Sequence, residues 1–427
     1  MSEENKMNRR DFMKLGGMAA VSLPVLSKMN KFEPAGLLES ELALSENIIM
    51  SGSVVRGKAV PQITDLDHMV ALSGVNRGSG SQVLKSAIKN AAQDATDFTW
   101  LSKGDAVLIK PVLNSGNPYP ATTSPEAVSA MVELLKEKGA GRVIVSDMSG
   151  IEHVKLTEKK LEGSSRQLMQ ACGMAEAALE AGAELYFPEE AGWEAFFEDY
   201  LVDTTYWKKA IMMPKIIQEV DHIVLLPRCG RHLLLGSSLG MKAAVGYWRT
   251  DTRLEYHKDA STIQEKTADA NTVKCLREKQ RLVLTTANRI MTTNGPDSGF
   301  VSEPETGLVI ASESIVAHDM VSLGWLIQNR LAMSDEEKDG SRDLYKSQFV
   351  VGNVNRLVVM KLGGFGEAWQ TEKLLRNDIG SIWNDRVLNR AYEVFGGIPR
   401  VKLVDPRDSV PHETKENLFE KVSKSDI

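Results

Sequence analysis

Cysteine is scarce in this 427-residue chain, which contains only Cys172, Cys229 and Cys275. The three lie far apart, so they form no Cys-x-x-Cys motif, no iron–sulfur spacing and no even-numbered disulfide framework. We therefore expect no iron–sulfur cluster. Cys229 follows an arginine that would lower the pKa of its thiol, but a lone cysteine after a strand is more often inert.

Long apolar runs and basic tracts are also missing. No stretch is long and apolar enough to predict a transmembrane span. The net charge is −6, with no Lys/Arg-rich run and no alternation of aromatic and basic residues, which argues against nucleic acid as a partner. A composition with 42% hydrophobic and 25% charged residues is ordinary for a globular protein with a large core.

The N-terminus carries the pattern of an export signal. The segment Asn8-Arg-Arg-Asp-Phe-Met-Lys14 directly precedes the apolar run 15–26, and paired arginines followed by Phe and Lys resemble a twin-arginine signal. The alternative is a basic amphipathic segment. We expect the chain to use the twin-arginine export machinery. It would then be periplasmic, or tethered to the membrane by an uncleaved signal, since no Ala-x-Ala cleavage site is clear.

Short apolar runs alternate with helical periodicity through most of the chain. Apolar strands over 105–113 and 142–147 flank a helix over 126–138, whose N-cap would be Ser124, and the three form a βαβ unit. Further strands are predicted at 183–187, 222–226, 281–286, 307–312 and 401–404, and further helices at 83–95, 165–181, 314–328 and 385–392. The pattern predicts an α/β fold with a mostly parallel sheet, helices on both faces, and a smaller C-terminal α+β extension.

Changes in composition divide the chain into four parts. We expect a twin-arginine signal segment over 1–31, a polar linker over 32–60, an α/β domain over 61–335 and the C-terminal extension over 336–427.

The stretch from Arg228 to Lys258 is a positive island in an acidic chain, with six Lys/Arg against two acids. It follows the predicted strand at 222–226 and is read as a loop containing a small-residue turn, 236–240. A cationic, Gly-rich loop after a strand of an open α/β sheet is a common place for an anionic ligand. The turn is not a P-loop, because the GK[ST] ending is missing.

Four strand-end loops, 110–114, 147–150, 228–242 and 294–299, should meet at one crevice of such a sheet. We expect a cationic pocket there for a small carboxylate or phosphate. Its ligand-binding residues would be Lys110, Asn114, Thr122, Ser124, Asp147, Arg228, Arg231, Arg249, Arg253 and Asp297. The alternative is that these charges are ordinary solvated surface charges, an alternative strongest for Arg249, Arg253 and Lys258.

His232, Lys242 and His257 are the predicted catalytic residues. A histidine titrates near neutral pH and can move a proton or bind a metal. A lysine beside glycines can approach a ligand closely or bond to it covalently. The alternative is a pair of surface histidines and a solvated lysine. His318 lies on a predicted helix and is expected to be structural.

Several motifs between residues 105 and 325 carry a family resemblance. They are Leu108-Ile-Lys-Pro with Asn114, Thr122-Thr-Ser-Pro-Glu126, Ser238-Leu-Gly-Met-Lys-Ala243, Asn294-Gly-Pro296, and Val309-Ile-Ala-Ser312 with Asp319. Together they resemble the bacterial and archaeal family catalogued as domain of unknown function 362, which has no settled chemistry. Some members carry ferredoxin-type cysteines that this chain lacks. Arg228 and Arg231 stand where the family tends to have lysines, and Val112 where it has asparagine.

A weaker resemblance is to the lactate racemase family, whose nickel-pincer nucleotide is attached to a lysine. A His, a Gly/Ser-rich turn, a Lys and a later His occur here at similar spacing, at positions 232, 236–240, 242 and 257. This resemblance implies Lys242 as the cofactor attachment, His257 as a metal ligand and His232 as a proton-transfer base. The other His-containing motif of that family is not evident, so racemisation itself is not implied.

Taken together, the sequence predicts an exported protein that acts as an enzyme on a small anionic ligand. His232 or His257 would do the acid/base work, while Lys110, Arg228 and Lys242 would hold the anion. The alternative, from a different functional class, is a periplasmic protein that binds an anion or a metal without turnover. The cofactor is open, with a metal or a nickel-pincer nucleotide as the candidates from the resemblance.

Overall fold

In the computed structural model, residues 62–340 and 343–423 are described, and a mixed sheet runs through their centre. Its main path is β15 (Ile398–Val404), β1 (Ile63–Asn76), β14 (Thr306–Ser312), β12 (Gln280–Met291), β9 (His222–Leu226), β2 (Ala106–Pro111), β3 (Arg142–Ser146) and β6 (Glu184–Tyr186). From β12 to β6 every neighbouring pair is parallel, and so is β1 with β15. Only β14 runs antiparallel to both of its neighbours. The predicted mostly parallel α/β fold is confirmed.

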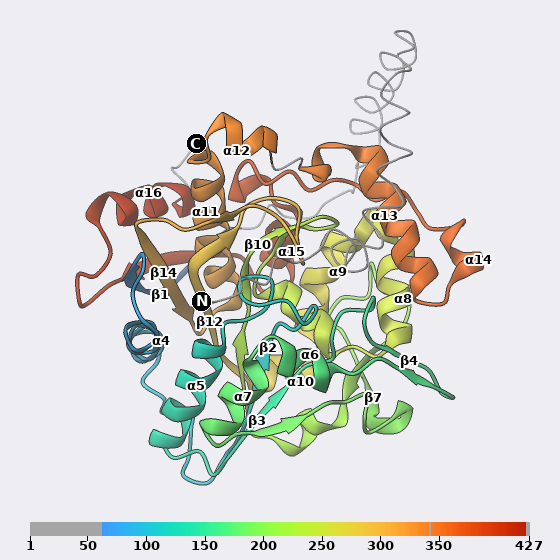
Figure 1. The fold of residues 1–427 in the computed structure, drawn as a ribbon, viewed down its shortest axis with the longest axis horizontal. Helices are drawn as coiled ribbons and strands as arrows, with labels where there is room; N and C mark the ends of the chain where they lie inside the picture. Colours follow the sequence, from blue (N-terminus) through green and yellow to red (C-terminus); the bar gives the residue numbers. More distant parts are fainter. Residues whose placement is uncertain (1–61, 341–342, 424–427) are drawn as a thin grey trace, which may run out of the picture. The chain divides into compact units, whose positions relative to one another are not determined.

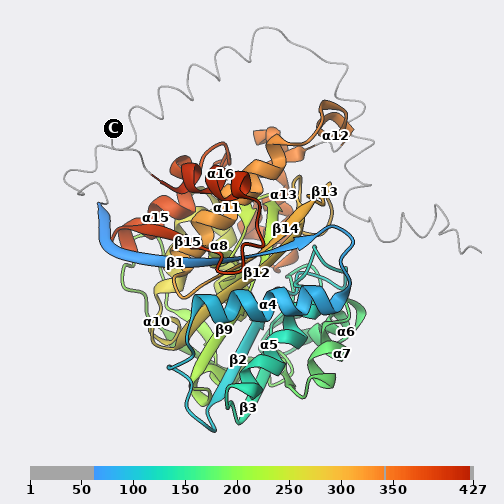
Figure 2. The same cartoon turned by 90° about the vertical axis from the view of Figure 1, so that its left-hand side faces the viewer.

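Side chains at alternate positions of the strands belong to two separate hydrophobic cores. In β2, Val107 and Ile109 belong to one core and Leu108 to the other, as the two-residue period of a strand requires. The first core is covered by α4 (Ser81–Ala95), α5 (Pro125–Glu137), α6 (Ser165–Ala171) and α7 (Met174–Glu180). The second is covered by α8 (Thr250–Lys258), α9 (Ile263–Asp269), α10 (Lys274–Lys279), α11 (Ile315–Leu331), α13 (Gln348–Lys361), α15 (Arg386–Val394) and α16 (His412–Val422). Figures 1 and 2 show these helices on both faces of the sheet.

Helix α5 forms for the reasons its sequence suggests. Ser124 has extended backbone angles, and its side chain accepts a hydrogen bond from the amide of Ala127, while Pro125 occupies the first helical position. The buried face carries Val128, Met131, Val132 and Leu135, among others. Gly139, with φ of +110°, ends the helix and leads into β3. The predicted βαβ unit is therefore present.

One predicted helix differs in detail, and one strand was not predicted. The single helix expected over 165–181 is two short helices, because Gly173 lies between them with φ of +83°. Strand β1 was not predicted. It has 14 residues, but its first half is exposed, with Leu66 72% and Met69 46% accessible, so it lacks the apolar alternation of a buried strand.

The basic stretch after β9 is also more ordered than a loop. Residues Arg228–His232 form strand β10, which runs parallel to the later part of β12, and Gly236–Ser238 form β11, which pairs with it as a hairpin. The small-residue turn predicted at 236–240 is thus partly a strand. Residues after Gly240 continue as a buried 3-10 segment, Met241–Tyr247. Because of this arrangement, the cations of the stretch lie within the fold rather than on an exposed loop.

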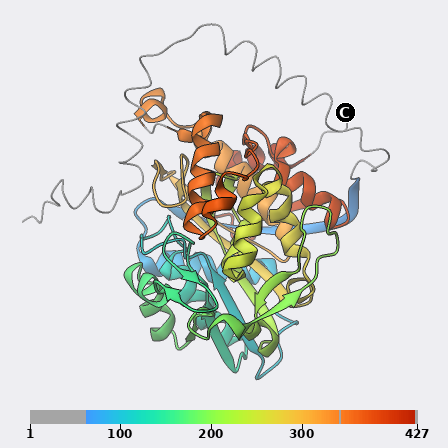
Figure 3. The same ribbon diagram turned by 90° about the vertical axis from the view of Figure 1, so that its right-hand side faces the viewer.

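The C-terminal residues share the core of the α/β domain. Strand β15 extends the sheet beside β1, and Tyr345, Val351 and Leu374 are buried in the second core. Helix α13 packs against α8 and α14 (Phe365–Ala368), and Figure 3 shows α13 in orange beside the yellow helices. The short helix α12 (Asp335–Gly340) precedes this part. Residues 61–427 group as one compact unit.

The predicted signal segment and linker, residues 1–60, lie outside the described residues. Among the helices that the structure describes, none combines the length and the apolar composition needed to cross a bilayer.

Candidate functional site

The carboxyl ends of four parallel strands meet at one edge of the sheet. Lys110 and Pro111 at the end of β2 pair with Leu225 and Leu226 of β9, and β3 and β12 flank them. A small cavity of about 40 Å³ lies at this edge. Five of the predicted site residues line it: Lys110, Asn114, Asp147, Lys242 and Arg253. A cavity of this size has room for a few water molecules or one small ion.

Lys110 and Asp147 form a buried ion pair below the cavity. The Lys110 Nζ lies 3.0 Å from Asp147 Oδ1 and also donates to the carbonyls of Pro111 (2.8 Å) and Ala243 (3.0 Å). Asp147 Oδ2 accepts from the amide of Leu113 at 2.7 Å. Burial lowers the pKa of Lys110, and the charge of Asp147 opposes this effect. Lys110 therefore has three partners inside the protein, which link the end of β2 to Asp147 and to the segment 241–247.

Arg253 and Arg249 are likewise fully engaged with the protein. Arg253 is buried and donates to the carbonyls of Trp248, Ser149 and Met148, so it fixes the loop that carries Asp147. Burial lowers its pKa to about 10. Arg249 pairs with Asp251 at 2.9 Å and lies over the ring of Trp193, 3.9 Å from its centroid. Neither arginine behaves as a solvated surface charge.

Asn114, Thr122 and Ser124 hold the loop between β2 and α5. Asn114 Nδ2 donates to the carbonyl of Ala121, Thr122 Oγ1 donates to the carbonyl of Asn117, and Ser124 caps α5. Of these three, only Asn114 lines the cavity. The polar groups of Thr122 and Ser124 serve the backbone of their own loop.

Arg228, Arg231 and Asp297 do not line this cavity, and Arg231 instead lines a different cavity of about 380 Å³. Arg228 Nε donates to the carbonyl of Pro120, and its buried Nη1 has no hydrogen-bond partner among the described residues. Burial lowers the pKa of Arg228 to about 10, and the charge of Asp297 opposes this shift. Arg231 donates to the carbonyl of Gly236 and lies over the ring of Tyr345.

Lys242 differs from the other cations in having no partner. It sits in the segment 241–247, is partly exposed, and lines two neighbouring cavities. Within residues 62–340 and 343–423, its ammonium makes no hydrogen bond and no ion pair. Surrounding protein and the charges of Arg228 and Arg253 lower its pKa to about 8.

The charge of Lys242 affects the pKa values of His232 and His257. Burial, followed by repulsion from Lys242, lowers the pKa of His232 well below 6.5 and that of His257 to about 3. His232 Nδ1 accepts from the amides of Leu234 (3.1 Å) and Leu235 (3.4 Å), which places its proton on Nε2. The buried Nδ1 of His257 has no hydrogen-bond partner in the described structure. The fold thus brings the three predicted catalytic residues into one electrostatic group of two neutral imidazoles and an amine.

Two residues without a predicted site role contact the segment before Lys242 or the neighbouring ion pair. Asp319 in α11 accepts from the amides of Gly240 and Met241, both at 2.8 Å, and also contacts His318 Nδ1 at 2.9 Å. His318 Nε2 in turn reaches Thr285 Oγ1, so His318 is buried and structural, as expected. Gly246 lies against the Lys110–Asp147 pair, and no local pattern in the sequence marks either contact.

No group of three or more His, Cys, Asp or Glu side chains gathers as a metal site in the part of the chain that is described. His257 offers one unpartnered imidazole nitrogen, which is one ligand of the three or four that a protein-held metal needs. The three cysteines are buried and separate, and burial raises the pKa of each.

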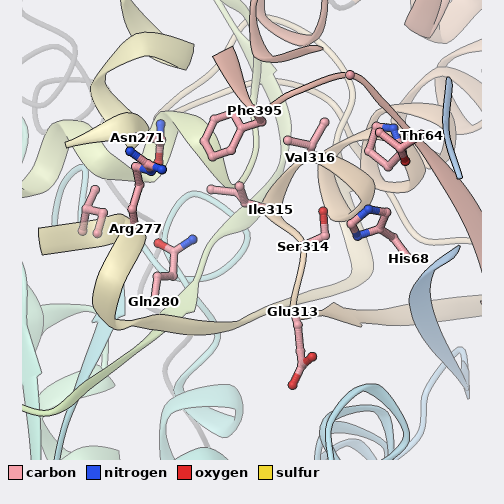
Figure 4. Close-up of a pocket in the computed structure, with 13 residues that line it drawn as sticks. Thr64, His68, Asn271, Arg277, Gln280, Glu313, Ser314, Ile315, Val316 and Phe395 are labelled. Carbon is pink, nitrogen blue, oxygen red and sulfur yellow. The ribbon is translucent and has the colours of Figure 1, made fainter. Parts of the chain in front are cut away.

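A larger cavity of about 440 Å³ lies at the opposite, amino end of the parallel strands, next to Gln280 at the start of β12 (Figure 4). Arg277 and His68 lie on opposite sides of it, and Ser314, which caps α11, lies between them. None of the predicted site residues lines this cavity. The candidate site is therefore the cavity at the carboxyl ends of the strands, where the unpartnered amine of Lys242 lies.

Comparisons with known proteins agree with the motifs. The family model described as Domain of unknown function (DUF362) matches residues 107–324, which is 218 of the 427 residues. No curated protein matches the sequence.

Among the solved structures that are similar, two share 13% sequence identity with this chain. One is a protein from Thermotoga maritima, with a TM-score of 0.35 and 54% of each chain covered, so the present chain spans about half the length of that protein. The other is the lactate racemase apoprotein from Thermoanaerobacterium thermosaccharolyticum, with a TM-score of 0.37, covering 84% of this chain and 90% of the other.

Proposed function

The chain belongs to the family described as Domain of unknown function (DUF362), and from the site in its matched region we propose that it is an exported enzyme acting on a small carboxylate or phosphate, which binds at Lys242.

The observation that carries this proposal is the unpartnered ammonium of Lys242. Lys110, Arg253 and Arg249 have carbonyl or carboxylate partners, so their charges are already balanced or bound. Lys242 lies among them without a counter-ion and reaches the cavity and solvent. A cation held near other cations in a partly buried site is stabilised by an anion, and a small anion fits the available volume.

Binding of an anion at Lys242 would also raise the pKa values of the neighbouring imidazoles, His232 and His257. Repulsion from the ammonium is one reason why His257 and His232 have lowered pKa values. An anion paired with Lys242 cancels this repulsion, so the pKa of both imidazoles rises toward the range where a general base works best. We assign the base role to His257, because its Nδ1 makes no hydrogen bond of good geometry, with only the side chain of Asn355 near the ring, whereas His232 Nδ1 accepts from a backbone amide.

The cofactor of the lactate racemase family is not needed for this proposal. Lys242 has the free amine that covalent attachment would require, and His257 would be the one protein ligand to a metal carried on such a group. When bound, a pincer nucleotide would supply hydride chemistry. The steps proposed here, holding the anion and moving a proton, use Lys242 and His257 alone.

The test is anion binding to the full-length protein and to a Lys242→Ala variant, measured by NMR titration with acetate and with inorganic phosphate. We expect the substitution to weaken binding by at least about tenfold, as for loss of a hydrogen bond to a charged group. The matched control is Lys160→Ala, which removes the same charge from a lysine that is 68% exposed. Equal affinity of the wild type and Lys242→Ala would sink the proposal.

Turnover is tested separately from binding. Protein from its native host would be incubated with its co-purifying small anions, and the anions would be identified by mass before and after. A chemical change that depends on His257 supports the enzyme. Recovery of a bound anion chemically unchanged supports the alternative, a periplasmic anion-binding protein without turnover.

Export is tested at the two arginines of the signal pattern. A variant with Arg9→Lys and Arg10→Lys is expected to remain in the cytoplasm, whereas the wild type is recovered from the periplasm or the membrane. An unchanged distribution in cell fractionation would contradict the twin-arginine assignment.

A further inference from the structure

We propose that this protein has a second, separate binding site, which takes an organic phosphate, in the cavity lined by Arg231, Arg330, Lys346 and Arg376. The cavity measures about 380 Å³ and lies between the end of α11, the turn Leu344–Lys346 and residues 376–380. No residue lines both this cavity and either of those at Lys242.

The charge of the lining is strongly positive for an acidic protein. Four cations, Arg231, Arg330, Lys346 and Arg376, face two carboxylates, Asp343 and Asp378, and the fifth cation of the lining, Lys338, pairs with Asp335 at 3.6 Å. These residues come from separate parts of the chain, so their convergence is a property of the fold. A cluster of this kind raises the local concentration of anions.

The carboxylates present do not balance the arginines. Asp343 is shared, since its Oδ2 lies 3.3 Å from Arg330 and 3.7 Å from Arg231. Arg231 is 3% exposed, and its Nε has no hydrogen-bond partner among the described residues. Burial and repulsion from Arg330 lower the pKa of Arg231 to about 10. Two guanidinium groups that repel each other across one carboxylate favour an additional anion.

Two of the cations, Lys346 and Arg376, lie at the rim of the cavity, and Arg376 is held there by a hydrogen bond. Arg376 Nη1 donates to the carbonyl of Lys346, which fixes its guanidinium beside that residue. Both side chains belong to exposed residues, so they can reach a ligand without rearrangement of the core. Guanidinium groups bind the oxygens of a phosphate in pairs, which gives both strength and orientation.

The floor of the cavity is apolar. Ile327, Met333 and Ile379 are buried and line it. A free inorganic ion would leave this surface in contact with water, whereas a phosphate ester with an apolar group would cover it. The chemistry that fits is therefore a phosphate head group for the cations and an apolar body for the floor.

The test is a calorimetric titration of the full-length protein with phenyl phosphate, compared with inorganic phosphate and with benzyl alcohol. In the full-length Lys242→Ala variant, which lacks the anion site proposed above, we expect saturable 1:1 binding of phenyl phosphate, binding of inorganic phosphate weaker by about fivefold or more, and no measurable binding of the alcohol. No saturable binding of phenyl phosphate would overturn the proposal.

Three variants locate the site. Removing two rim cations, Lys346→Ala with Arg376→Ala, is expected to weaken binding by about tenfold or more. The matched control, Arg356→Ala with Lys373→Ala, removes the same charge from two exposed positions of the same region and should leave the affinity within about twofold. Asp378→Asn removes a competing carboxylate from the lining and should tighten binding about two- to fivefold.

The two sites are distinguished by Lys242→Ala. Binding of phenyl phosphate that survives this substitution supports a separate site, even if the function proposed for Lys242 fails. If Lys242→Ala abolishes it, or if the control pair weakens it as much as the rim pair, the cavity at Arg231 is not where the phosphate binds.

Discussion

The ammonium of Lys110 and the carboxylate of Asp147 form a 3.0 Å ion pair that is almost entirely buried, at 1% and 3% exposure of their side chains. Gly246 packs directly against this ion pair. A Cβ atom at position 246 would lie 1.9 Å from Asp147 Oδ1 and 2.6 Å from Lys110 Nζ. The amide of Met148 also donates to the carbonyl of Gly246, so the backbone cannot simply move away.

Gly246→Ala is therefore expected to destabilise the protein. The methyl group must separate the pair or displace the segment, and a buried charge that loses its partner costs about 3–5 kcal/mol. We expect the free energy of unfolding in urea to fall by about 2–4 kcal/mol, since partial relaxation recovers some of that loss.

The control for this substitution is Gly352→Ala in α13. A Cβ atom there meets nothing within 4 Å, so the change should be neutral or should stabilise the helix by about 0.5–1 kcal/mol. Equal unfolding free energies for the two variants would show that the contact at Gly246 is not a constraint.

The elements that were predicted correctly are those whose positions are set by short patterns in the sequence. Ser124, Pro125 and Gly139 delimit α5 as expected, and the apolar run 222–226 is the central strand β9. Parallel order also predicted that strand-end loops meet, and residues of 110–114, 147–150 and Lys242 line one cavity, whereas no residue of 294–299 lines it. Capping residues and apolar runs of a few residues are enough to predict these features.

The features that were not predicted depend on partners far away in the chain. Strand β10 contains Arg, Cys, Gly, Arg and His, so it has no strand-like alternation, and it forms because β12 lies beside it. For Arg253 the sequence leaves two alternatives open, a ligand-binding residue or a solvated surface charge. It is buried because three carbonyls, two of them about a hundred residues away, accept its donors. Asp319 holds the segment before Lys242 from a helix that follows it by almost eighty residues.

Anion binding at Lys242 should depend on pH in a defined direction. Only the protonated amine attracts the anion, and its pKa in the free protein is about 8. Affinity for acetate, whose own charge is constant in this range, should be flat from about pH 6 to 7.5 and should fall by up to about tenfold per unit above pH 8. NMR titrations at several pH values measure this profile.

The Lys242→Arg variant gives the matching control. A guanidinium stays protonated through this range, so the fall in affinity should disappear while binding at neutral pH is retained. An identical decrease above pH 8 in the variant would assign the titration to another group.

His257 should contribute to acid sensitivity, because its pKa in the folded protein is about 3 against an ordinary value of 6.5. Between these two values the unfolded state binds more protons than the folded state, so the free energy of unfolding falls as the pH falls through this window. At pH 4.5 the loss from this residue should be about 2–3 kcal/mol relative to pH 7. Urea unfolding of the wild type and of His257→Gln, at both pH values, measures it.

The variant itself should be less stable at pH 7, because it replaces a well-packed buried ring, but its loss of stability on acidification should be smaller by that amount. His232 is also buried with a lowered pKa, so the stability of the variant still falls to some extent on acidification.

His412→Gln is the control, since His412 is 81% exposed and its removal should leave the dependence of stability on pH unchanged. Saturating acetate should reduce the slope of the wild type toward that of His257→Gln, because an anion at Lys242 removes the repulsion that opposes protonation of His257. If His257→Gln loses as much stability between pH 7 and 4.5 as the wild type does, the imidazole at 257 is not buried in the neutral form, and the base role proposed for it has no basis.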